Sequence, residues 1–156
     1  MSILTSRASK QIPLKPYMLH DVRGNIISTI RSQIGTYIST YGYIKDIKDI
    51  DISPVGDISR MSEDILFKAE YTIHHVIPRV GDVYECGISN IIPQGIFCSF
   101  EKIFILLPVQ PDWEYYENHV KSMKIGDSLF YEGDTIRARI TTVKFENMYK
   151  CIGAVA

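Results

Sequence analysis

The fold is decided by two stretches that open in the same way, VGDVYECGISNIIPQGIFCSF at residues 80–100 and EGDTIRARITTVKFENMYKCIGAV at residues 132–155. Each begins with Gly-Asp and then alternates apolar and polar residues over about eight positions, which is typical of a half-buried β-strand. Glycine permits a turn before the strand, and aspartate caps that turn. The two stretches therefore predict two strands that enter one core after the same kind of turn.

The strand pattern continues through the second half of the chain. Strands are predicted at residues 82–91, 95–109, 134–145 and 149–155, and the second of these divides into two at Glu101-Lys102. Five short strands without a long helical period predict a small barrel of the OB type over residues 79–156. In that barrel the predicted inward side chains are Tyr84, Cys86, Ile88, Ile136, Ala138 and Ile140. The connection at residues 108–127 is too long for a hairpin and is expected to hold a short helix or an ordered loop.

The first half of the chain has a mixed pattern. IPLKP at residues 12–16 predicts a short strand, and two further strands are predicted at residues 41–48 and 65–78. Between the first two strands, steps of three and four predict a helix with an apolar stripe at Val22, Ile26, Ile27, Ile30, Ile34 and Ile38. The expected fold class is α+β, with a strand-helix-strand-strand domain at residues 1–78 followed by a five-stranded OB-fold β-barrel.

The composition is that of a packed globular chain. Of its 156 residues 46% are hydrophobic, and the formal net charge of −1 carries no polybasic signature for nucleic acid or membrane. No apolar run approaches the roughly 20 residues of a transmembrane helix, and the N-terminus lacks the apolar region of a secretory signal. Cys86, Cys98 and Cys151 form no CxxC pair, which favours reduced thiols in an intracellular, reducing compartment.

Catalytic and metal-binding patterns are missing from the sequence. Asp49 and Asp51 have no Gly-rich phosphate loop or third convergent ligand beside them, which favours an exposed acidic edge. His74 and His75 are adjacent in a predicted strand and therefore point to opposite faces. We expect no catalytic residue, no metal site and no cofactor.

An ordered series of motifs carries a resemblance to a known family. From residue 12 the chain contains IPLKP, the apolar helical stripe, YGYIKDIKDIDISPVGDI and FKAEYTIHHVIPRVGDVYECGI. This series resembles the stalk subunit of multisubunit DNA-directed RNA polymerases, the seventh-subunit family of eukaryotic RNA polymerase II and its archaeal equivalent. The resemblance covers nearly the whole chain, and the barrel half also resembles the RNA-binding domain named after ribosomal protein S-one.

The resemblance implies a non-catalytic role in transcription. Its N-terminal domain would dock on RNA polymerase core subunits near the clamp, beside a smaller helical stalk partner of the fourth-subunit family. Its barrel would reach toward nascent RNA and bind it weakly. The implied location is the nucleus, or the cytoplasm or virion if the source is a large DNA virus. The alternative is a free-standing protein of the OB class that binds single-stranded RNA.

Four residues are candidates for contacting RNA. Phe97 has the outward parity of its predicted strand, and Arg137, Arg139 and Lys144 form a basic line on another. Relatives of the barrel carry a second aromatic where this chain has Gln94, and a histidine near the position of Leu106. The competing interpretations are a Phe97 ring covered by a partner subunit and a solvated basic strand face.

Two segments are candidate partner interfaces. One is the turn after the strand at residues 41–48, and the other is an aromatic group in the long connection, where closing the open end of the barrel is an equally good explanation. The candidate interface residues are Pro54, Val55, Gly56, Asp57, Ile58, Trp113, Tyr115 and Tyr116.

Overall fold

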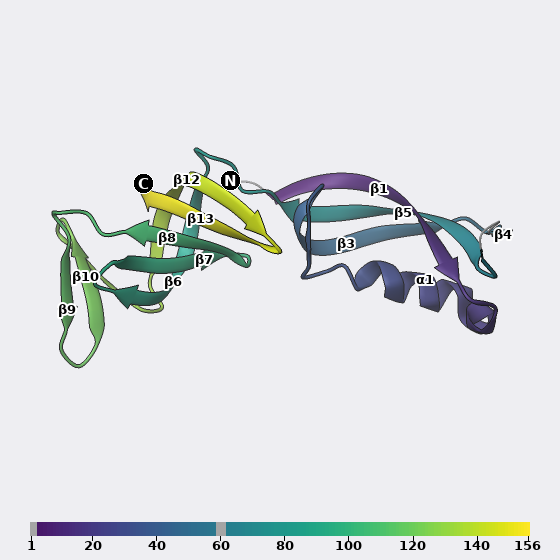
Figure 1. Ribbon diagram of the computed structural model, residues 1–156, viewed down its shortest axis with the longest axis horizontal. Helices are drawn as coiled ribbons and strands as arrows, with labels where there is room; N and C mark the ends of the chain where they lie inside the picture. Colours follow the sequence, from purple (N-terminus) through teal and green to yellow (C-terminus); the bar gives the residue numbers. More distant parts are fainter. Residues whose placement is uncertain (1–2, 59–61) are drawn as a thin grey trace. The chain divides into compact units, whose positions relative to one another are not determined.

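The computed structural model describes residues 3–58 and 62–156 and divides them into two compact units, residues 3–77 and residues 78–156 (Figure 1). None of the helices in these described ranges has the length and apolar character that crossing a membrane requires.

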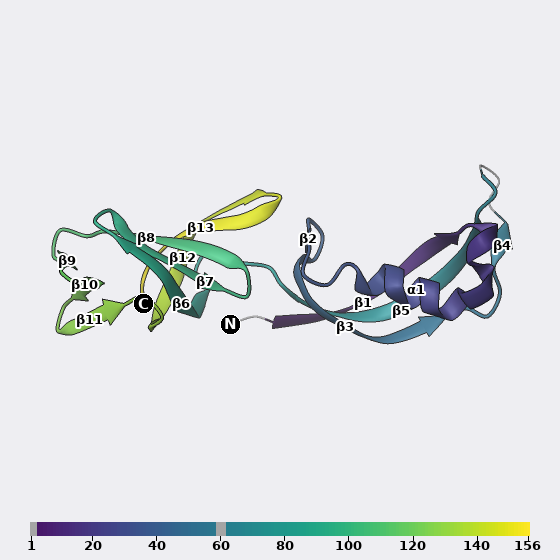
Figure 2. The same cartoon turned by 90° about the horizontal axis from the view of Figure 1, so that it is seen from below.

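The first unit is an antiparallel sheet with helices on one face. Its strands lie in the order β1 (Ile3–Leu14), β5 (Ile65–Val76), β3 (Gly42–Ile52) and β2 (Tyr37–Ile38), and the short β4 (Asp57–Ile58) pairs with β5. A 3-10 helix, η1 (Pro16–Asp21), leads into α1 (Val22–Arg31), which runs along one face of the sheet in two views (Figures 1 and 2). The side chain of Asp21 accepts a hydrogen bond of 3.0 Å from the Gly24 N–H and so caps α1.

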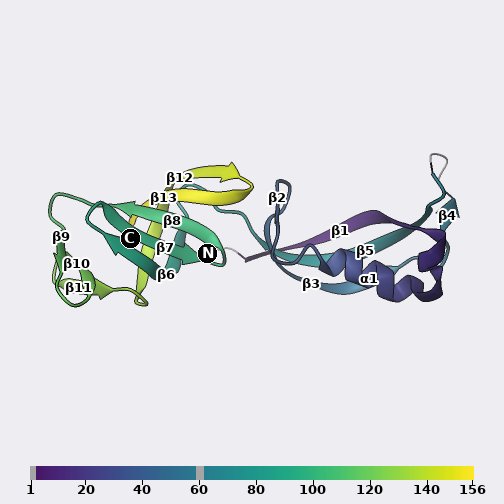
Figure 3. The same cartoon turned by 60° about the horizontal axis from the view of Figure 1, so that its bottom comes forward.

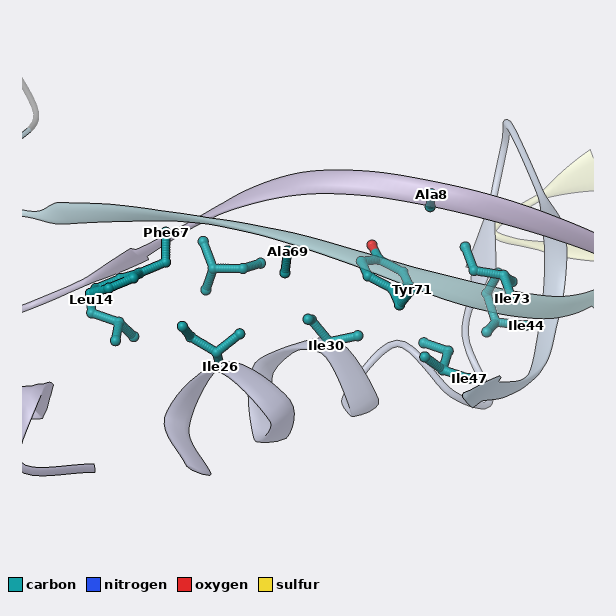
Figure 4. Packing of buried hydrophobic residues seen from close by; sticks show 11 residues of the cluster. Ala8, Leu14, Ile26, Ile30, Ile44, Ile47, Phe67, Ala69, Tyr71 and Ile73 are labelled. Atoms are coloured by element: carbon teal, nitrogen blue, oxygen red, sulfur yellow. The ribbon is translucent and has the colours of Figure 1, made fainter. Parts of the chain in front are cut away.

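The core of this unit lies between α1 and the sheet. Ile26 and Ile30 point from α1 toward Phe67, Ala69 and Tyr71 of β5 (Figure 4). Both isoleucines are fully buried, and they are four residues apart on one side of the helix. The part of the predicted stripe formed by Ile26 and Ile30 therefore packs onto the sheet.

Three details of the first unit differ from the sequence-based prediction. The strand predicted at residues 12–16 begins at Ile3, since the polar run before residue 12 pairs in register with β5 along its whole length. The helix ends at Arg31, so Ile34 and Ile38 lie in the turn and in β2 beyond it. Gly35, in this turn, has a φ of +86°, a left-handed conformation that does not continue an α-helix. The two-residue strands β2 and β4 were not predicted.

The second unit contains the closed five-stranded barrel that the sequence predicts. Its strands are β6 (Val83–Ile92), β7 (Gly95–Phe100), β8 (Ile103–Pro108), β12 (Thr135–Glu146) and β13 (Met148–Val155), in the closed order β12-β13-β8-β7-β6. Only the β13–β8 pair of these five is parallel. All six predicted inward residues are buried, and the turn between β7 and β8 is Glu101-Lys102.

The repeated Gly-Asp openings form two equivalent turns. Gly81 and Gly133 have φ values of +95° and +91°, which glycine adopts without strain. In each turn the backbone N–H three residues before the aspartate donates to its carboxylate, at 3.1 Å for Asp82 and 2.8 Å for Asp134. The same residues therefore build the same local structure twice.

Each of the two turns also hydrogen-bonds to the strand that follows the other turn. β6 and β12 run antiparallel, and each Gly-Asp pair lies beside the middle of the opposite strand, at Ile140 of β12 and Ile88 of β6. Four backbone hydrogen bonds make the arrangement reciprocal: Gly81 N–H to Ile140 O (2.8 Å), Ile140 N–H to Asp82 O (2.8 Å), Gly133 N–H to Ile88 O (2.9 Å) and Ile88 N–H to Asp134 O (2.8 Å). This β6–β12 seam completes the barrel.

The long connection is neither the helix nor the loop that the sequence analysis expected. It forms a small antiparallel sheet of β9 (Glu114–Glu117), β10 (Lys121–Ile125) and β11 (Ser128–Tyr131), visible beside the barrel in Figure 3. The side chain of Met123 in the central strand is fully buried, and β10 lies close to β6. Burial of Met123 stabilises these three strands. The strands are short and mostly polar, so the sequence alone does not predict them.

Candidate nucleic-acid interface

The outer faces of four barrel strands form one continuous lattice of side chains. In its first row Phe97 of β7 lies opposite Leu106 of β8. Leu106 in turn lies beside Ile152 of β13. Ile152 lies opposite Thr142 of β12. Neighbouring strands are roughly 4.7–4.9 Å apart, so this row crosses the barrel wall as a contiguous surface.

A second row lies next to the first. Ser99 pairs with Phe104, Phe104 pairs with Lys150, and Lys150 pairs with Lys144. The side chains of both rows point outward, since alternate residues of each strand fill the core. The lattice therefore places two phenylalanines on β7 and β8, and two lysines on β12 and β13.

A hollow of about 620 Å³ covers this lattice. Its side chains are mainly apolar, and Phe97 and Phe104 remain 39% and 42% exposed. An exposed apolar surface of this kind on a folded domain marks an interaction site. The residues that line the hollow are Phe97, Phe104, Ile105, Leu106, Thr142, Lys144, Met148, Lys150, Cys151 and Ile152.

Lys144 reaches the outer face because β12 contains a register shift. The shift lies between Ile140 and Thr142, and it reverses the inward and outward alternation beyond that point. Without it, counting from the exposed Arg139 would place Lys144 inside the barrel. The bulge thus brings an ammonium group to the rim of the hollow.

The two lysines face each other directly across the β12–β13 pair. Like charges in opposite positions of a sheet destabilise it, and a bound anion would relieve the repulsion. Lys144 also forms an exposed ion pair of 3.2 Å with Glu146. That exposed pair is worth little in water, so the ammonium can exchange its partner for a phosphate.

The structure separates the four predicted RNA-contacting residues into two groups. Phe97 and Lys144 line the hollow, whereas Arg137 and Arg139 do not. The two arginines lie where β12 pairs with β6, and Arg137 is directly opposite Glu85. The basic line of the sequence is therefore split between the β6–β12 seam and the rim of the hollow.

Phe104 and Lys150 line the hollow but are not among the residues predicted from the sequence to contact RNA. Phe104 alternates with the buried Ile103 and Ile105, so its outward direction could have been inferred from the same parity that identified Phe97. Lys150 alternates with Tyr149 and Cys151 in the same way. What the sequence does not reveal is that the parallel pairing of β13 with β8 makes Phe104 and Lys150 neighbours.

The candidate interface residues of the first unit are mostly exposed. Val55 and Ile58 are 70% and 82% exposed, and Pro54 and Asp57 are exposed beside them. Gly56 is half-buried, and a Cβ there would lie 2.6 Å from the Ile65 side chain. The turn was expected to extend to residues 59–61, which lie outside the described residues.

The aromatic group of the long connection divides between the two faces of the small sheet. Tyr115 is half-buried and pairs with the buried Met123, and Trp113 is also half-buried. Tyr116 is exposed, and its hydroxyl donates to the Glu114 carboxylate. Tyr115 thus shares the buried side of β10, and Tyr116 is available to solvent.

The remaining titratable residues show no catalytic arrangement in the part of the chain that the structure describes. No group of three or more His, Cys, Asp or Glu residues there is placed to hold a metal ion. Asp51 forms an ion pair of 2.7 Å with Arg7. His75 is buried, with its Nδ1 bonded to the Tyr41 carbonyl and its Nε2 to the Ser6 hydroxyl.

Comparison with known proteins finds a distant similarity to an enzyme. No family model matches the chain. The curated polyribonucleotide nucleotidyltransferase of Parabacteroides distasonis is 26% identical over 122 residues, which are 77% of this chain and 15% of that enzyme. The chain therefore corresponds to a small part of the length of the protein that it matches.

Proposed function

We propose that the barrel binds single-stranded RNA in the hollow on its β7–β8–β13–β12 face and that the protein is non-catalytic. The observation that carries this proposal is the lattice that brings Phe97, Phe104, Lys144 and Lys150 together. Exposed aromatic rings beside cations are the usual means of binding single strands without reading their sequence. In OB folds the face of the second and third strands, here β7 and β8, is the usual surface for oligonucleotides.

The similar protein supports RNA as the ligand. Its name describes an enzyme that acts on polyribonucleotides. A small part of such an enzyme would contribute binding rather than its whole activity.

The test is the affinity of the full chain for a 12-nucleotide RNA of mixed sequence across a salt series. Stacking contributes about 1–3 kcal/mol per base, so Phe97→Ala should weaken binding at least fivefold. Each phosphate contact of a single strand contributes about −0.7 to the slope of log K against log salt, so Lys150→Gln should make the slope shallower by about that amount. Arg139→Gln is the matched control, because Arg139 is an exposed cation of β12 outside the hollow.

The outcomes separate the possible ligands. RNA binding that Arg139→Gln weakens and Phe97→Ala leaves unchanged would move the site to the β6–β12 seam. DNA of the same sequence measures whether the 2′-hydroxyl contributes. An RNA affinity too weak to measure at low salt would contradict RNA binding in the hollow.

A second candidate function is that of a stalk subunit of a DNA-dependent RNA polymerase. The ordered resemblance from residue 12 onward supports it, and the observation that favours it is the exposure of Val55 and Ile58 in the first unit. These side chains would contact polymerase core subunits, while a smaller helical partner binds alongside and the barrel meets the transcript.

Co-purification from the native source tests this second function. Polymerase subunits should accompany the wild-type chain and should be lost from a Val55→Ser/Ile58→Ser variant. Val80→Ser, which changes an equally exposed valine of the second unit, should retain them. A wild-type chain that brings down no polymerase subunit would leave the free-standing RNA-binding protein as the better description.

A further inference from the structure

We infer that the hollow selects an extended, unstacked RNA strand and therefore prefers oligouridylate to oligoadenylate. The inference rests on the proposed RNA binding and adds a substrate class to it. It also assigns Phe104 as the residue that creates the selectivity. The sequence indicates a single aromatic platform, Phe97, whereas the lattice contains two exposed rings, those of Phe97 and Phe104.

The two rings are too far apart for two stacked bases to contact both. Phe97 pairs with Leu106, and Phe104 precedes Leu106 by two residues on the same outer face. Phe97 and Phe104 are therefore diagonal neighbours, which in antiparallel pairs lie roughly 7–8 Å apart. Successive stacked bases of one strand are about 3.4 Å apart along the axis. Two neighbouring bases that each stack on one ring must therefore separate from each other.

The floor between the rings is apolar. Leu106 lies directly beside both Phe97 and Ile152. Among the ten lining residues, all of them within the described part of the chain, Thr142 supplies the one hydroxyl. The hollow thus lacks the paired donors and acceptors that read a base edge, so discrimination must come from the flexibility and self-stacking of the strand.

The lysines place the sugar-phosphate backbone on one side of the hollow. Lys150 is directly beside Phe104, and Lys144 is directly beyond Lys150 on β12. A strand with its bases over β7 and β8 would therefore have its phosphates over β13 and β12. This arrangement holds an extended backbone next to bases that no longer stack on one another.

The cost of unstacking differs between homopolymers. Each base of oligoadenylate that enters the hollow exchanges a stacked neighbour for a phenylalanine ring. A base of oligouridylate gains the ring and gives up little, because uridylate strands are largely unstacked in solution. Preferences of this origin are modest, so we expect U12 to bind about fivefold to tenfold more tightly than A12.

The experiment measures U12 and A12 affinities for three full-length proteins at one low salt concentration. The wild type should show the fivefold to tenfold preference for U12. Phe104→Leu keeps an apolar side chain but leaves one ring, so its U12 affinity should fall and its U12-to-A12 ratio should approach one. Phe145→Leu is the matched control, because Phe145 is 39% exposed on β12 and does not line the hollow; its ratio should equal that of the wild type.

Two results would overturn the inference while leaving RNA binding in place. One is a wild-type affinity for A12 equal to or greater than that for U12. The other is a Phe104→Leu variant that keeps the full preference, with a melting temperature showing that it is folded. Failure of the wild type to bind either oligomer would instead overturn the proposed function itself.

Discussion

The three thiols of the chain are enclosed in the barrel wall. Cys86, Cys98 and Cys151 are free and buried, although Cys151 lines the hollow from below. Burial raises the pKa of the Cys151 thiol to about 11. A hydrogen bond between Cys98 and Cys86 raises the pKa of Cys98 and lowers that of Cys86. Because all three side chains are buried, they act as small core residues, as strand parity predicted for Cys86 and Cys98, and their reactivity in the folded protein should be low.

A thiol-counting experiment tests this enclosure. At pH 8 a thiol with a pKa of about 11 is ionised in roughly one molecule in a thousand. We expect DTNB to modify almost none of the three cysteines in the native chain and all three in guanidinium chloride. Rapid native modification of one equivalent, lost in Cys151→Ala, would show that the hollow opens far enough to expose that thiol.

The same residue predicts an alkaline loss of stability. A buried thiol whose folded pKa exceeds its unfolded value of about 8.5 keeps its proton in the folded state while the unfolded chain releases it. The contribution of the Cys151 thiol to the free energy of unfolding is complete below about pH 8.5 and decreases as the pH rises toward 11. The free energy of unfolding should therefore decline less steeply over this range in Cys151→Ala than in the wild type. Parallel pH profiles would contradict the assignment.

At the scale of the elements, the two Gly-Asp turns differ in one hydrogen bond. Both carboxylates accept a backbone N–H, but Asp82 also accepts the Tyr84 hydroxyl at 2.9 Å. Asp134→Ala should lower the free energy of unfolding by about 1 kcal/mol and Asp82→Ala by about 2 kcal/mol, because the second change also removes the hydrogen bond from the Tyr84 hydroxyl. Urea denaturation followed by circular dichroism measures both.

The chain supplies its own control for this comparison. Asp127 follows Gly126 in a third Gly-Asp turn, between β10 and β11, and is exposed. Asp127→Ala should change stability by less than about 0.5 kcal/mol. Equal losses at Asp82 and Asp134 would mean that the Tyr84 bond adds nothing to the seam.

Strand parity made most of the barrel predictable. Alternation identified the six inward residues and the outward direction of Phe97, because each side chain of a long strand must point one way or the other. The β-bulge at Ile140 and Thr142 has no comparable signal, and it decides on which face Lys144 lies. The strands β9 to β11 are only four or five residues long, too short for a period of two to be recognised.

The site was less predictable than the fold. Phe97 and Phe104 belong to neighbouring strands of one hairpin, whereas Lys150 joins them through a parallel pairing of β13 with β8 that local sequence does not encode. Arg137 and Arg139 looked equivalent to Lys144 in the sequence, and only the place where β6 meets β12 separates them. Long-range pairing, rather than residue type, selects which exposed cations share the hollow.

At the scale of the whole molecule, each unit has its own core. Ile30 is fully buried between α1 and the first sheet, and Ile91 is fully buried in the second unit. Replacing a buried isoleucine with alanine costs about 2–5 kcal/mol. We expect Ile30→Ala to lower the melting temperature of one calorimetric transition and Ile91→Ala that of another. RNA affinity at 25 °C should survive Ile30→Ala, and a single transition displaced by both changes would contradict independent units.

The reciprocal β6–β12 seam has a consequence for how the protein is made on the ribosome. The first unit is contiguous from residue 3 to residue 77, so it has all its partners once that segment has emerged. The seam instead cannot form until residues 133–140 have been synthesised, about 50 residues after residues 81–88. At roughly 5–20 residues per second, this leaves β6 without its closing strand for several seconds. During that interval its open edge and apolar face are exposed to chaperones and to neighbouring nascent chains, so slowing translation across residues 90–130 should reduce the soluble yield of the barrel more than slowing it across residues 15–60.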